Sequence, residues 1–268
     1  MTRIVAHRGS SSSWPEHTRA AFRQAIADGA DGLECDVRLT AEGVAVCWHD
    51  ATVDRTSDGS GPVLDHTIDE LRGLDVLGGA RVPAHLGRAG QQVLTLAELV
   101  EMATDAGRPL TLAIELKHPA PYGWRAEDVV LDVLDRAGWV DGRIGDVDVS
   151  LMSFHPGSLA HLASRVDGRV LMPLLDLLDP ATVGDVPPDV AVDLLAESVA
   201  MVDSGAAGGV GPSVAYVRAH PDRVRRWSEA GRVVRAWTVD TADDLDVCRR
   251  AGVGEVTTND PAGLRRLL

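Results

Sequence analysis

The stretch GLECDVRLTAEGVAVCWHD, residues 32–50, decides the fold because it places two apolar runs on either side of a short turn. Residues 32–37 and 44–49 each have the composition of a β-strand. A parallel connection between strands needs about a dozen residues or more. The few residues between these two runs are therefore expected to join them as an antiparallel hairpin.

Outside this hairpin, apolar runs typical of strands alternate with segments of helical spacing. We expect strands at residues 4–7, 110–116, 148–154, 169–175, 206–210, 233–239 and 255–258. We expect a first helix from the turn at Trp14-Pro15 to Gly29, and others at residues 95–106, 127–137, 156–165, 214–230 and 241–251.

Without the hairpin arm at residues 44–49, eight strands remain, which is the number that a closed parallel barrel requires. The length of 268 residues is also close to that of one such barrel. The sequence therefore predicts the α/β class and a single (β/α)₈ TIM barrel over residues 1–268. Residues 50–92 are long and rich in Gly and Asp, and we expect them to form a loop-rich insertion after the hairpin, over the active-site end.

The charge of the chain excludes several kinds of partner. A net charge of −14 argues against nucleic acid and against stable association with anionic membranes. An anionic small molecule would need local cations or a metal. The three cysteines have no metal-motif spacing, and we see no signal peptide or membrane span, so a cytoplasmic location is expected. The oligomeric state is left open.

Acidic and imidazole side chains gather at the expected strand ends. Glu34 and Asp36 are two residues apart on one strand, so they share a face. Two carboxylates on one face repel each other unless a cation lies between them, and a hard divalent ion such as Mg²⁺ or Ca²⁺ prefers oxygen ligands. His7 ends the first apolar run and His49 ends the hairpin arm, and both could give and take protons near neutral pH.

A later strand repeats this pattern. Glu115 could complete a three-carboxylate metal site, while Lys117, two residues further on, could hold a phosphate oxygen. Arg8 could clamp the same phosphate. Trp237, near the end of another strand, is expected to be core or pocket wall. Each feature also has an ordinary structural explanation, and it is their joint occurrence at successive strand ends that indicates a phosphodiester site with one divalent cation.

The position of His49 depends on the register of the hairpin. A two-residue turn at Glu42-Gly43 would put His49 opposite Asp36 and on the same face. A three-residue turn would shift it by one and turn it away. We favour the first, because it gathers the candidate site residues.

These residues belong to stretches that resemble the glycerophosphodiester phosphodiesterase family. The matching stretches are AHRG at 6–9, PEHT at 15–18, GLECDV with LTAEG at 32–43, HD with DRT at 49–56, GSG at 59–61, TIDEL at 67–71, IELK at 114–117, AWTVD at 236–240 and TNDP at 258–261. They follow the order of the family across nearly the whole chain. The combination is specific, and it is strongest in the first 120 residues.

The resemblance implies a TIM barrel and the hydrolysis of a glycerophosphodiester to glycerol 3-phosphate and an alcohol. It implies the following roles: Glu34, Asp36 and Glu115 as ligands of one divalent cation, Mg²⁺ or Ca²⁺; His7 and His49 as general acid and base; Arg8 and Lys117 as phosphate contacts; and Trp237 as a wall on the alcohol side. The implied partner is therefore a small-molecule glycerophosphodiester. Which histidine is the acid, and whether a cyclic phosphate forms first, are left open.

Two positions depart from the family pattern. His17 stands where the family usually has Asn, and Val93-Leu94-Thr95-Leu96 lacks the usual Pro before the helix. Two other functions remain as alternatives. One is a phospholipase D-like or lysophospholipid hydrolase, which would need an apolar entrance to the pocket. The other is an inactive binding barrel, against which the retained acids and histidines count.

Overall fold

Eight parallel strands close into a ring in the computed structural model, which describes residues 2–118, 120–177 and 188–268. In ring order these strands are β1 (Arg3–His7), β2 (Gly32–Leu39), β4 (Leu110–Leu116), β6 (Val147–Ser153), β7 (Leu171–Leu175), β8 (Gly209–Pro212), β9 (Val233–Ala236) and β10 (Glu255–Thr258). The ring closes because β1 pairs with both β10 and β2. The predicted (β/α)₈ barrel is confirmed.

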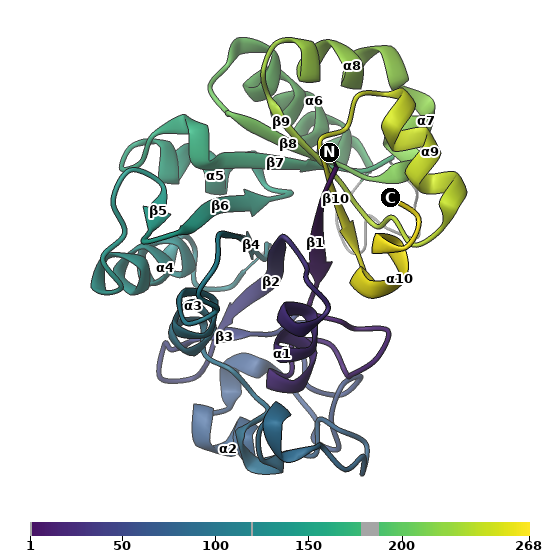
Figure 1. Ribbon diagram of the computed structural model, residues 1–268. Coiled ribbons are helices and arrows are strands. Elements are labelled where there is room, and N and C mark those ends of the chain that lie inside the picture. Colours follow the sequence, from purple (N-terminus) through teal and green to yellow (C-terminus); the bar gives the residue numbers. More distant parts are fainter. Residues whose placement is uncertain (1, 119, 178–187) are drawn as a thin grey trace.

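Helices surround the ring of strands (Figure 1). They are α1 (Arg19–Ala27), α2 (Ile68–Gly73), α3 (Leu96–Thr104), α4 (Arg125–Arg136), α5 (Pro156–Ala163), α6 (Pro188–Ser204), α7 (Val214–Ala219), α8 (Pro221–Glu229), α9 (Ala242–Arg250) and α10 (Pro261–Arg265). The short elements are β3 (Ala45–Cys47), β5 (Arg143–Ile144) and the 3₁₀ turns η1 (Val63–Asp65), η2 (Ala84–Leu86), η3 (Ala89–Gln91) and η4 (Gly168–Val170). Within the described residues, every helix is too short or too polar to span a lipid bilayer.

Two helices differ from the predictions by more than two residues at one end or in continuity, and both differences have local reasons. The first helix begins at Arg19, after Pro15, because the Thr18 hydroxyl accepts the amide hydrogen of Ala21 and caps the helix there. The expected helix over residues 214–230 is two helices, α7 and α8, which meet at His220-Pro221. Proline has no amide hydrogen and disfavours helical backbone in the residue before it, so the chain bends at this point.

Successive side chains of β2 point to opposite faces of the strand, so apolar residues face the helices and acidic residues face the site. Cys35 and its neighbours Leu33 and Val37 belong to the apolar layer between strands and helices. Glu34 and Asp36 lie on the other face of β2, toward the barrel interior. The interior itself is filled by an apolar cluster of Val5, Ala113, Met152, Met172 and Leu174.

The hairpin between β2 and β3 is antiparallel, as predicted, but the favoured register is wrong. Val37 pairs with Cys47, and the Thr40 amide donates to the Val44 carbonyl at 3.0 Å, so the loop has three residues, 41–43. Gly43 takes a φ of +82° at the end of this loop, as three-residue hairpin loops require. As a result, the Trp48 amide bonds the Asp36 carbonyl, at 3.0 Å, in the place expected for His49.

His49 nevertheless faces the barrel cavity, contrary to the expectation for a three-residue turn. The strand β3 ends at Cys47, and the backbone bends at His49. The Arg38 guanidinium holds the bend by donating to the His49 carbonyl at 2.8 Å. The alternation of side chains along β3 therefore does not extend to His49, and its imidazole points into the cavity.

Residues 50–92 pack beside the hairpin and contain η1, α2, η2 and η3. Val53, Val63 and Leu71 from this segment are buried against Val46 and Trp48 in one apolar cluster. In Figure 1 the segment is the blue region next to β3, at the bottom of the view. This packing fixes the chain on either side of Asp50 and Arg55, which matter for the site described next.

Candidate active site

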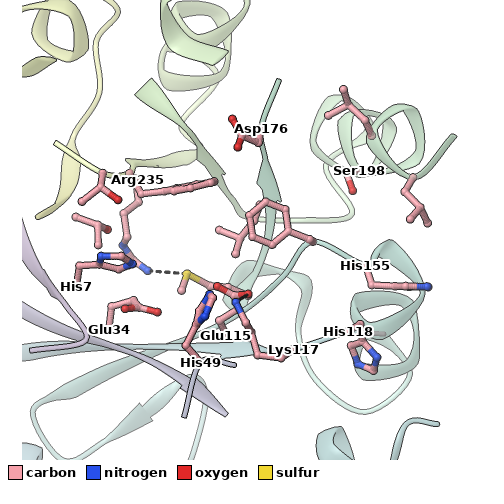
Figure 2. Close-up of a pocket in the computed structure, with 18 of the residues that line it drawn as sticks. His7, Glu34, His49, Glu115, Lys117, His118, His155, Asp176, Ser198 and Arg235 are labelled. Atoms are coloured by element: carbon pink, nitrogen blue, oxygen red, sulfur yellow. Dashed lines mark hydrogen bonds and ion pairs between the residues drawn. The ribbon is translucent and has the colours of Figure 1, made fainter. Parts of the chain in front are cut away.

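A cavity of about 570 Å³ opens at the carboxyl ends of the barrel strands. Its lining includes seven of the eight predicted site residues: His7, Arg8, Glu34, His49, Glu115, Lys117 and Trp237. Figure 2 shows most of them converging on one region of the cavity. The eighth, Asp36, lies behind Lys117, with 3.1 Å between the Lys117 Nζ and Asp36 Oδ1 atoms.

The three predicted metal ligands come together. Asp36 and Glu115 are direct partners across the β2–β4 pairing, and Glu34 precedes Asp36 on the same face. One carboxylate oxygen from each lies within 4.8 Å of the others. All three residues are buried, with Asp36 only 1% exposed. Burial of three acids at such short separation is unfavourable unless positive charge compensates it.

Part of that charge comes from Lys117 and Arg8. The Lys117 ammonium is 2.6 Å from Glu115 Oε1, and the Arg8 Nε atom is 3.1 Å from Asp36 Oδ2. The backbone amide of Arg8 also donates to Glu34 Oε2 at 2.9 Å. Arg8 has a φ of +58°, so the chain turns sharply after β1 and aims both its amide and its guanidinium at the acids.

The pKa directions show that this compensation is incomplete. Burial raises the pKa of Glu115 to about 7, against the opposing attraction of Lys117. Burial, and then the charge of Asp36, raises the pKa of Glu34 well above its usual value. For Asp36, burial alone would raise the pKa, but Lys117, His17 and Arg8 outweigh it and hold the pKa well below its usual range. Two of the three acids therefore resist ionisation in the protein alone.

The donor set fits a hard divalent cation. The Asp36 Oδ1 atom is buried and forms no hydrogen bond in the described part of the chain, and its one ion-pair contact there is with the Lys117 ammonium at 3.1 Å. When all three acids are ionised, they carry one negative charge more than Lys117 and Arg8 offset. Mg²⁺ and Ca²⁺ prefer carboxylate oxygens, and either ion would remove this imbalance.

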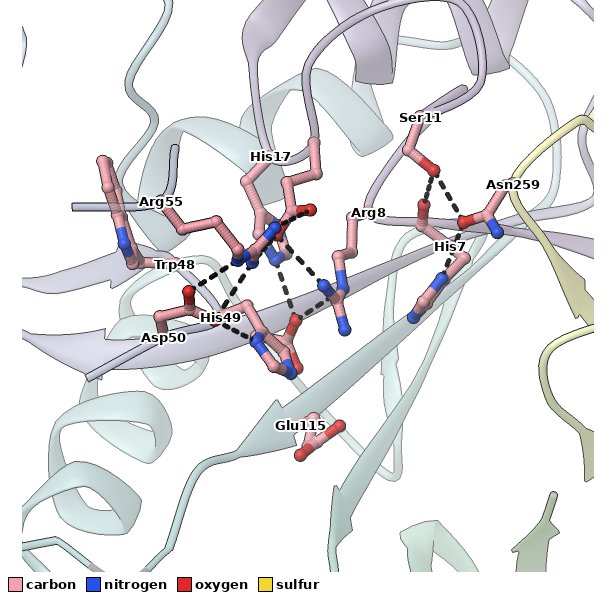
Figure 3. Close-up of polar contacts among 12 residues, drawn as sticks. His7, Arg8, Ser11, His17, Trp48, His49, Asp50, Arg55, Glu115 and Asn259 are labelled. Carbon is pink, nitrogen blue, oxygen red and sulfur yellow. Dashed lines mark hydrogen bonds and ion pairs between the residues drawn. The ribbon is translucent and has the colours of Figure 1, made fainter. Parts of the chain in front are cut away.

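His7 is anchored through one ring nitrogen (Figure 3). Its Nδ1 lies 2.9 Å from the side-chain oxygen of Asn259. The Asn259 amide in turn donates to Asp240 Oδ2 at 2.6 Å, and Ser11 donates to the same Asn259 oxygen at 2.8 Å. Because this oxygen can only accept, His7 Nδ1 carries the proton and Nε2 is left for chemistry in the cavity.

His49 is anchored in the same way by other residues. Its Nδ1 lies 2.6 Å from Asp50 Oδ1, and Arg55 donates to Asp50 Oδ2 at 2.6 Å. Arg55 also contacts Glu16, which forms an ion pair with Arg8 at 3.0 Å. A chain of charged contacts thus links the second imidazole to the phosphate-binding candidate Arg8, and leaves His49 Nε2 for chemistry.

Both imidazoles are neutral near pH 7 in the protein alone. Burial, followed by the charge of Arg8, lowers the pKa of His7 to about 4. Burial also lowers the pKa of His49 to about 4, although the charge of Asp36 opposes the shift. A neutral imidazole can accept a proton, and an arriving phosphate anion would favour its protonated form.

The remaining predicted residue, Trp237, forms part of the wall. Its indole nitrogen donates to the Gly211 carbonyl at 2.8 Å, and its ring packs on the interior cluster. Phe154 meets it edge to face, with ring centroids 5.4 Å apart.

Sequence reasoning missed the residues that position the site. Asn259 and Asp50 lie inside quoted family stretches but had no assigned role. His17 is noted in the sequence only as a departure from the family's Asn, yet its Nε2 lies 2.9 Å from Asp36 Oδ2, and the residue is only 5% exposed. The one available signal for His17 was its place in the PEHT stretch, since these contacts join segments far apart in the chain.

Three buried carboxylates, two cations and two imidazoles at the carboxyl end of a TIM barrel have the chemistry that a phosphoric diester hydrolase requires. A sequence model of the "Glycerophosphoryl diester phosphodiesterase family" matches residues 7–263. The chain belongs to this family.

Known relatives agree with this assignment. The chain is 37% identical over 260 residues to the "Probable glycerophosphodiester phosphodiesterase 1" of Mycobacterium tuberculosis, covering 96% of this chain and 89% of the relative. It is 31% identical over 268 residues to a glycerophosphodiester phosphodiesterase of Caldanaerobacter subterraneus, covering 100% of this chain and 98% of the relative. The fold is similar to that of an Oleispira antarctica phosphodiesterase solved with the product sn-glycerol-3-phosphate, with a TM-score of 0.77, 21% identity, and coverage of 100% of this chain and 96% of that one.

Proposed function

We propose that this protein hydrolyses glycerophosphodiesters to glycerol 3-phosphate and an alcohol, with one divalent cation at Glu34, Asp36 and Glu115. The observation that carries this proposal is the convergence of these three buried carboxylates, whose ligand oxygens lie within 4.8 Å of one another. A cation bound there would polarise the phosphoryl oxygens and offset the charge that develops on them.

The basic residues account for substrate binding. Lys117 and Arg8 line the cavity beside the acids, so each can contact a phosphate oxygen. The ion pairs that they form with Asp36 and Glu115 hold their side chains in place before substrate arrives. Holding them in advance lowers the entropy cost of ordering them on binding.

The two imidazoles account for proton transfer. One histidine takes a proton from water as the water oxygen bonds to phosphorus. The other, protonated at Nε2 when the phosphate anion is bound beside it, gives that proton to the alkoxide as the bond between the alkoxide oxygen and phosphorus breaks. Because Asn259 holds Nδ1 of His7 and Asp50 holds Nδ1 of His49, each ring works through Nε2. His7 and His49 are therefore the acid and the base, in either order.

The test is the release of glycerol 3-phosphate from glycerophosphocholine or glycerophosphoethanolamine. We expect release that requires added Mg²⁺ or Ca²⁺ and that stops on addition of EDTA. Glu115→Gln and Asp36→Asn should abolish it and also weaken ion binding measured by titration calorimetry. Turnover that EDTA leaves unchanged would contradict the metal assignment, and an absence of glycerol 3-phosphate under all conditions would contradict the reaction.

A small-molecule partner and a cytoplasmic location are part of the same proposal. The cavity is of a size typical for small ligands, roughly 300–1,000 Å³. The chain's net charge of −14 supports the exclusion of nucleic acid and of stable binding to anionic membranes.

A further inference from the structure

Arg55 uses all three nitrogens of its guanidinium on two acids. Its Nε and Nη2 atoms lie 2.6 and 3.0 Å from the two carboxylate oxygens of Asp50. Its Nη1 and Nη2 atoms lie 2.9 and 2.7 Å from the two carboxylate oxygens of Glu16. Both contacts are therefore forked, and Figure 3 draws them as dashed lines. A forked contact fixes the orientation of both partners, which a single ion pair does not do.

Each of these acids continues to a side chain that lines the cavity. Asp50 contacts Nδ1 of His49 at 2.6 Å, and Glu16 accepts from Nη1 of Arg8 at 3.0 Å. In the proposed function, His49 is an acid or a base and Arg8 is a phosphate contact. Arg55 lies outside the cavity lining, yet it is connected through one acid to each of these two groups.

The insertion at residues 50–92 fixes the place of Arg55. Val53, two residues before it, is fully buried in the apolar cluster that the insertion forms with Trp48. The Trp48 indole also donates to the Thr52 carbonyl at 3.1 Å. The backbone that leads to Arg55 is therefore held against the hairpin, and the guanidinium reaches both acids from a fixed position.

An ordinary surface ion pair is the competing explanation, because the Arg55 side chain is 50% exposed and exposed ion pairs contribute little to stability. The pKa values argue against it. Burial alone would raise the pKa of Glu16, but Arg55 and then Arg8 outweigh it and hold the pKa at about 2. Arg55 is also the largest cause that holds the pKa of Asp50 below its usual range. Arg55 thus keeps both acids ionised at the edge of the site.

Loss of Arg55 would change both connections. The Asp50 side chain is 26% exposed, so without Arg55 it can rotate toward water and release the His49 imidazole. An imidazole without an anchor changes tautomer and ring orientation, which slows proton transfer. Among the described residues, Glu16 would keep only Arg8 as a cationic partner, so more of its charge would oppose the binding of phosphate.

On these grounds, and resting on the proposed function, we propose that Arg55 is a positioning residue of this site. Through Asp50 it holds the His49 imidazole in the orientation that proton transfer needs. Through Glu16 it keeps the Arg8 guanidinium available to the phosphate. The insertion after the hairpin then has a defined role in the reaction, which is to bring one guanidinium to these two acids.

The first experiment compares Arg55→Ala with Arg72→Ala by steady-state release of glycerol 3-phosphate from glycerophosphocholine at saturating Mg²⁺ or Ca²⁺. Arg72 is the matched control, because it lies in the same insertion and pairs with Glu98 outside the cavity lining. We expect Arg55→Ala to lower kcat by roughly tenfold or more and to raise KM. Arg72→Ala should leave both values near those of the wild type. Equal values in the two variants would reduce the Arg55 contacts to a surface ion pair and overturn the inference.

Double variants test whether Arg55 acts through the two acids. In an Asp50→Asn background, loss of Arg55 should lower kcat little further, because the contact that it supports is already weakened. In a Glu16→Gln background, loss of Arg55 should raise KM little further for the same reason. Fully additive losses in both backgrounds would contradict the assignment.

Chemical rescue separates positioning from folding. Because the Arg55 side chain is half exposed, its removal opens a gap that solutes can reach. Guanidinium at about 20 mM is far below the concentrations that unfold proteins, and we expect it to restore kcat severalfold in Arg55→Ala only. Arg55→Lys should lie between the wild type and Arg55→Ala, since an ammonium cannot make two forked contacts. No recovery, or the same change in Arg72→Ala, would count against the positioning role.

A measurement without turnover separates this inference from the proposed function. NMR shifts of the imidazole nitrogens report the tautomer of each histidine, and His49→Ala identifies the signals of His49. We expect a protonated Nδ1 at His49 in the wild type and in Arg72→Ala, and a mixture of tautomers in Arg55→Ala that guanidinium reverses. If no glycerol 3-phosphate is released but this pattern holds, the positioning role is confirmed and the reaction is wrong. An unchanged tautomer in Arg55→Ala contradicts the inference even in an active enzyme.

Discussion

At the scale of single residues, the site depends on side-chain oxygens that each fix one nitrogen of an imidazole. Asn259 does this for His7, and Asp50 does it for His49. The two anchors differ in charge, since Asn259 is neutral and Asp50 is an acid held by Arg55. The charged anchor stabilises an imidazolium at His49 more than the neutral one does at His7.

Removing either imidazole should slow hydrolysis strongly. We expect His7→Ala and His49→Ala each to lower kcat by roughly 10²-fold or more, because general acid–base catalysis contributes an amount of that order. Steady-state release of glycerol 3-phosphate measures the change. The surface variant His85→Ala is the control, since His85 is exposed and lies outside the cavity lining. Near-normal rates in either site variant would exclude that histidine as acid or base.

His17 should influence the cation through Asp36. Its Nε2 contacts Asp36 Oδ2, so the other oxygen, Oδ1, which lies beside the Lys117 ammonium, is the one that an ion would take. We expect His17→Phe, which keeps a ring but loses the donor, to weaken divalent-ion binding by roughly 10- to 100-fold. His17→Asn should weaken it less, because Asn donates a hydrogen bond and tolerates the φ of +59° at this position. Calorimetric titration with Mg²⁺ or Ca²⁺ measures both, and equal affinities in the wild type and in His17→Phe would refute a positioning role.

At the scale of elements, two tight turns place the site residues. Gly9 follows β1 with a φ of +83° and reverses the chain just after His7 and Arg8. Gly43 closes the hairpin loop with a φ of +82°. Both positions need a left-handed backbone, but their surroundings differ.

This difference predicts unequal costs for the same substitution. A Cβ at Gly9 would lie 2.6 Å from the backbone carbon of Ala21, whereas at Gly43 it would meet the movable end of the Arg125 side chain. We expect Gly43→Ala to lower the free energy of unfolding by about 1 kcal/mol, from backbone strain alone. Gly9→Ala should cost at least about 3 kcal/mol, since the backbone of α1 must shift. Urea unfolding compares the two, and equal losses would mean that the contact with α1 relaxes freely.

At the scale of the whole molecule, the barrel buries charged and titratable groups that a solvated chain would leave in water. Burial lowers the pKa of His7 from 6.5 to about 4. Between these two pH values the unfolded chain binds a proton that the folded protein does not. Stability therefore rises with pH across this window and falls as pH drops from 6.5 toward 4.

The loss at pH 5 should be measurable by thermal unfolding in EDTA. For His7 alone we expect a decrease of about 1–2 kcal/mol relative to pH 7.5. His7→Asn should remove that part of the pH dependence, while the exposed-site variant His85→Asn should keep it. A pH dependence unchanged in His7→Asn would mean that other groups cause the loss.

The sequence by itself determined the barrel and most of the charged centre. Alternation on β2 predicts a shared face for Glu34 and Asp36, and the parallel βα order brings Glu115 to the same end, so no long-range contact had to be known. The break between α7 and α8 at His220-Pro221 also follows from local chemistry, because proline disfavours helical backbone in the residue before it. The continuous helical spacing of apolar residues over 214–230 nevertheless predicted a single helix.

Only the tertiary structure decided the hairpin register and the position of His49. Turns of two and three residues have similar local energies, so the choice depends on packing of Val46 and Trp48 against residues 50–92. The anchors of the imidazoles were equally hidden, because Asn259 is 252 residues from His7 in the chain. A sequence pattern reports neighbours along the backbone, whereas closure of the barrel brings its first and last strands together, and the site lies across that closure.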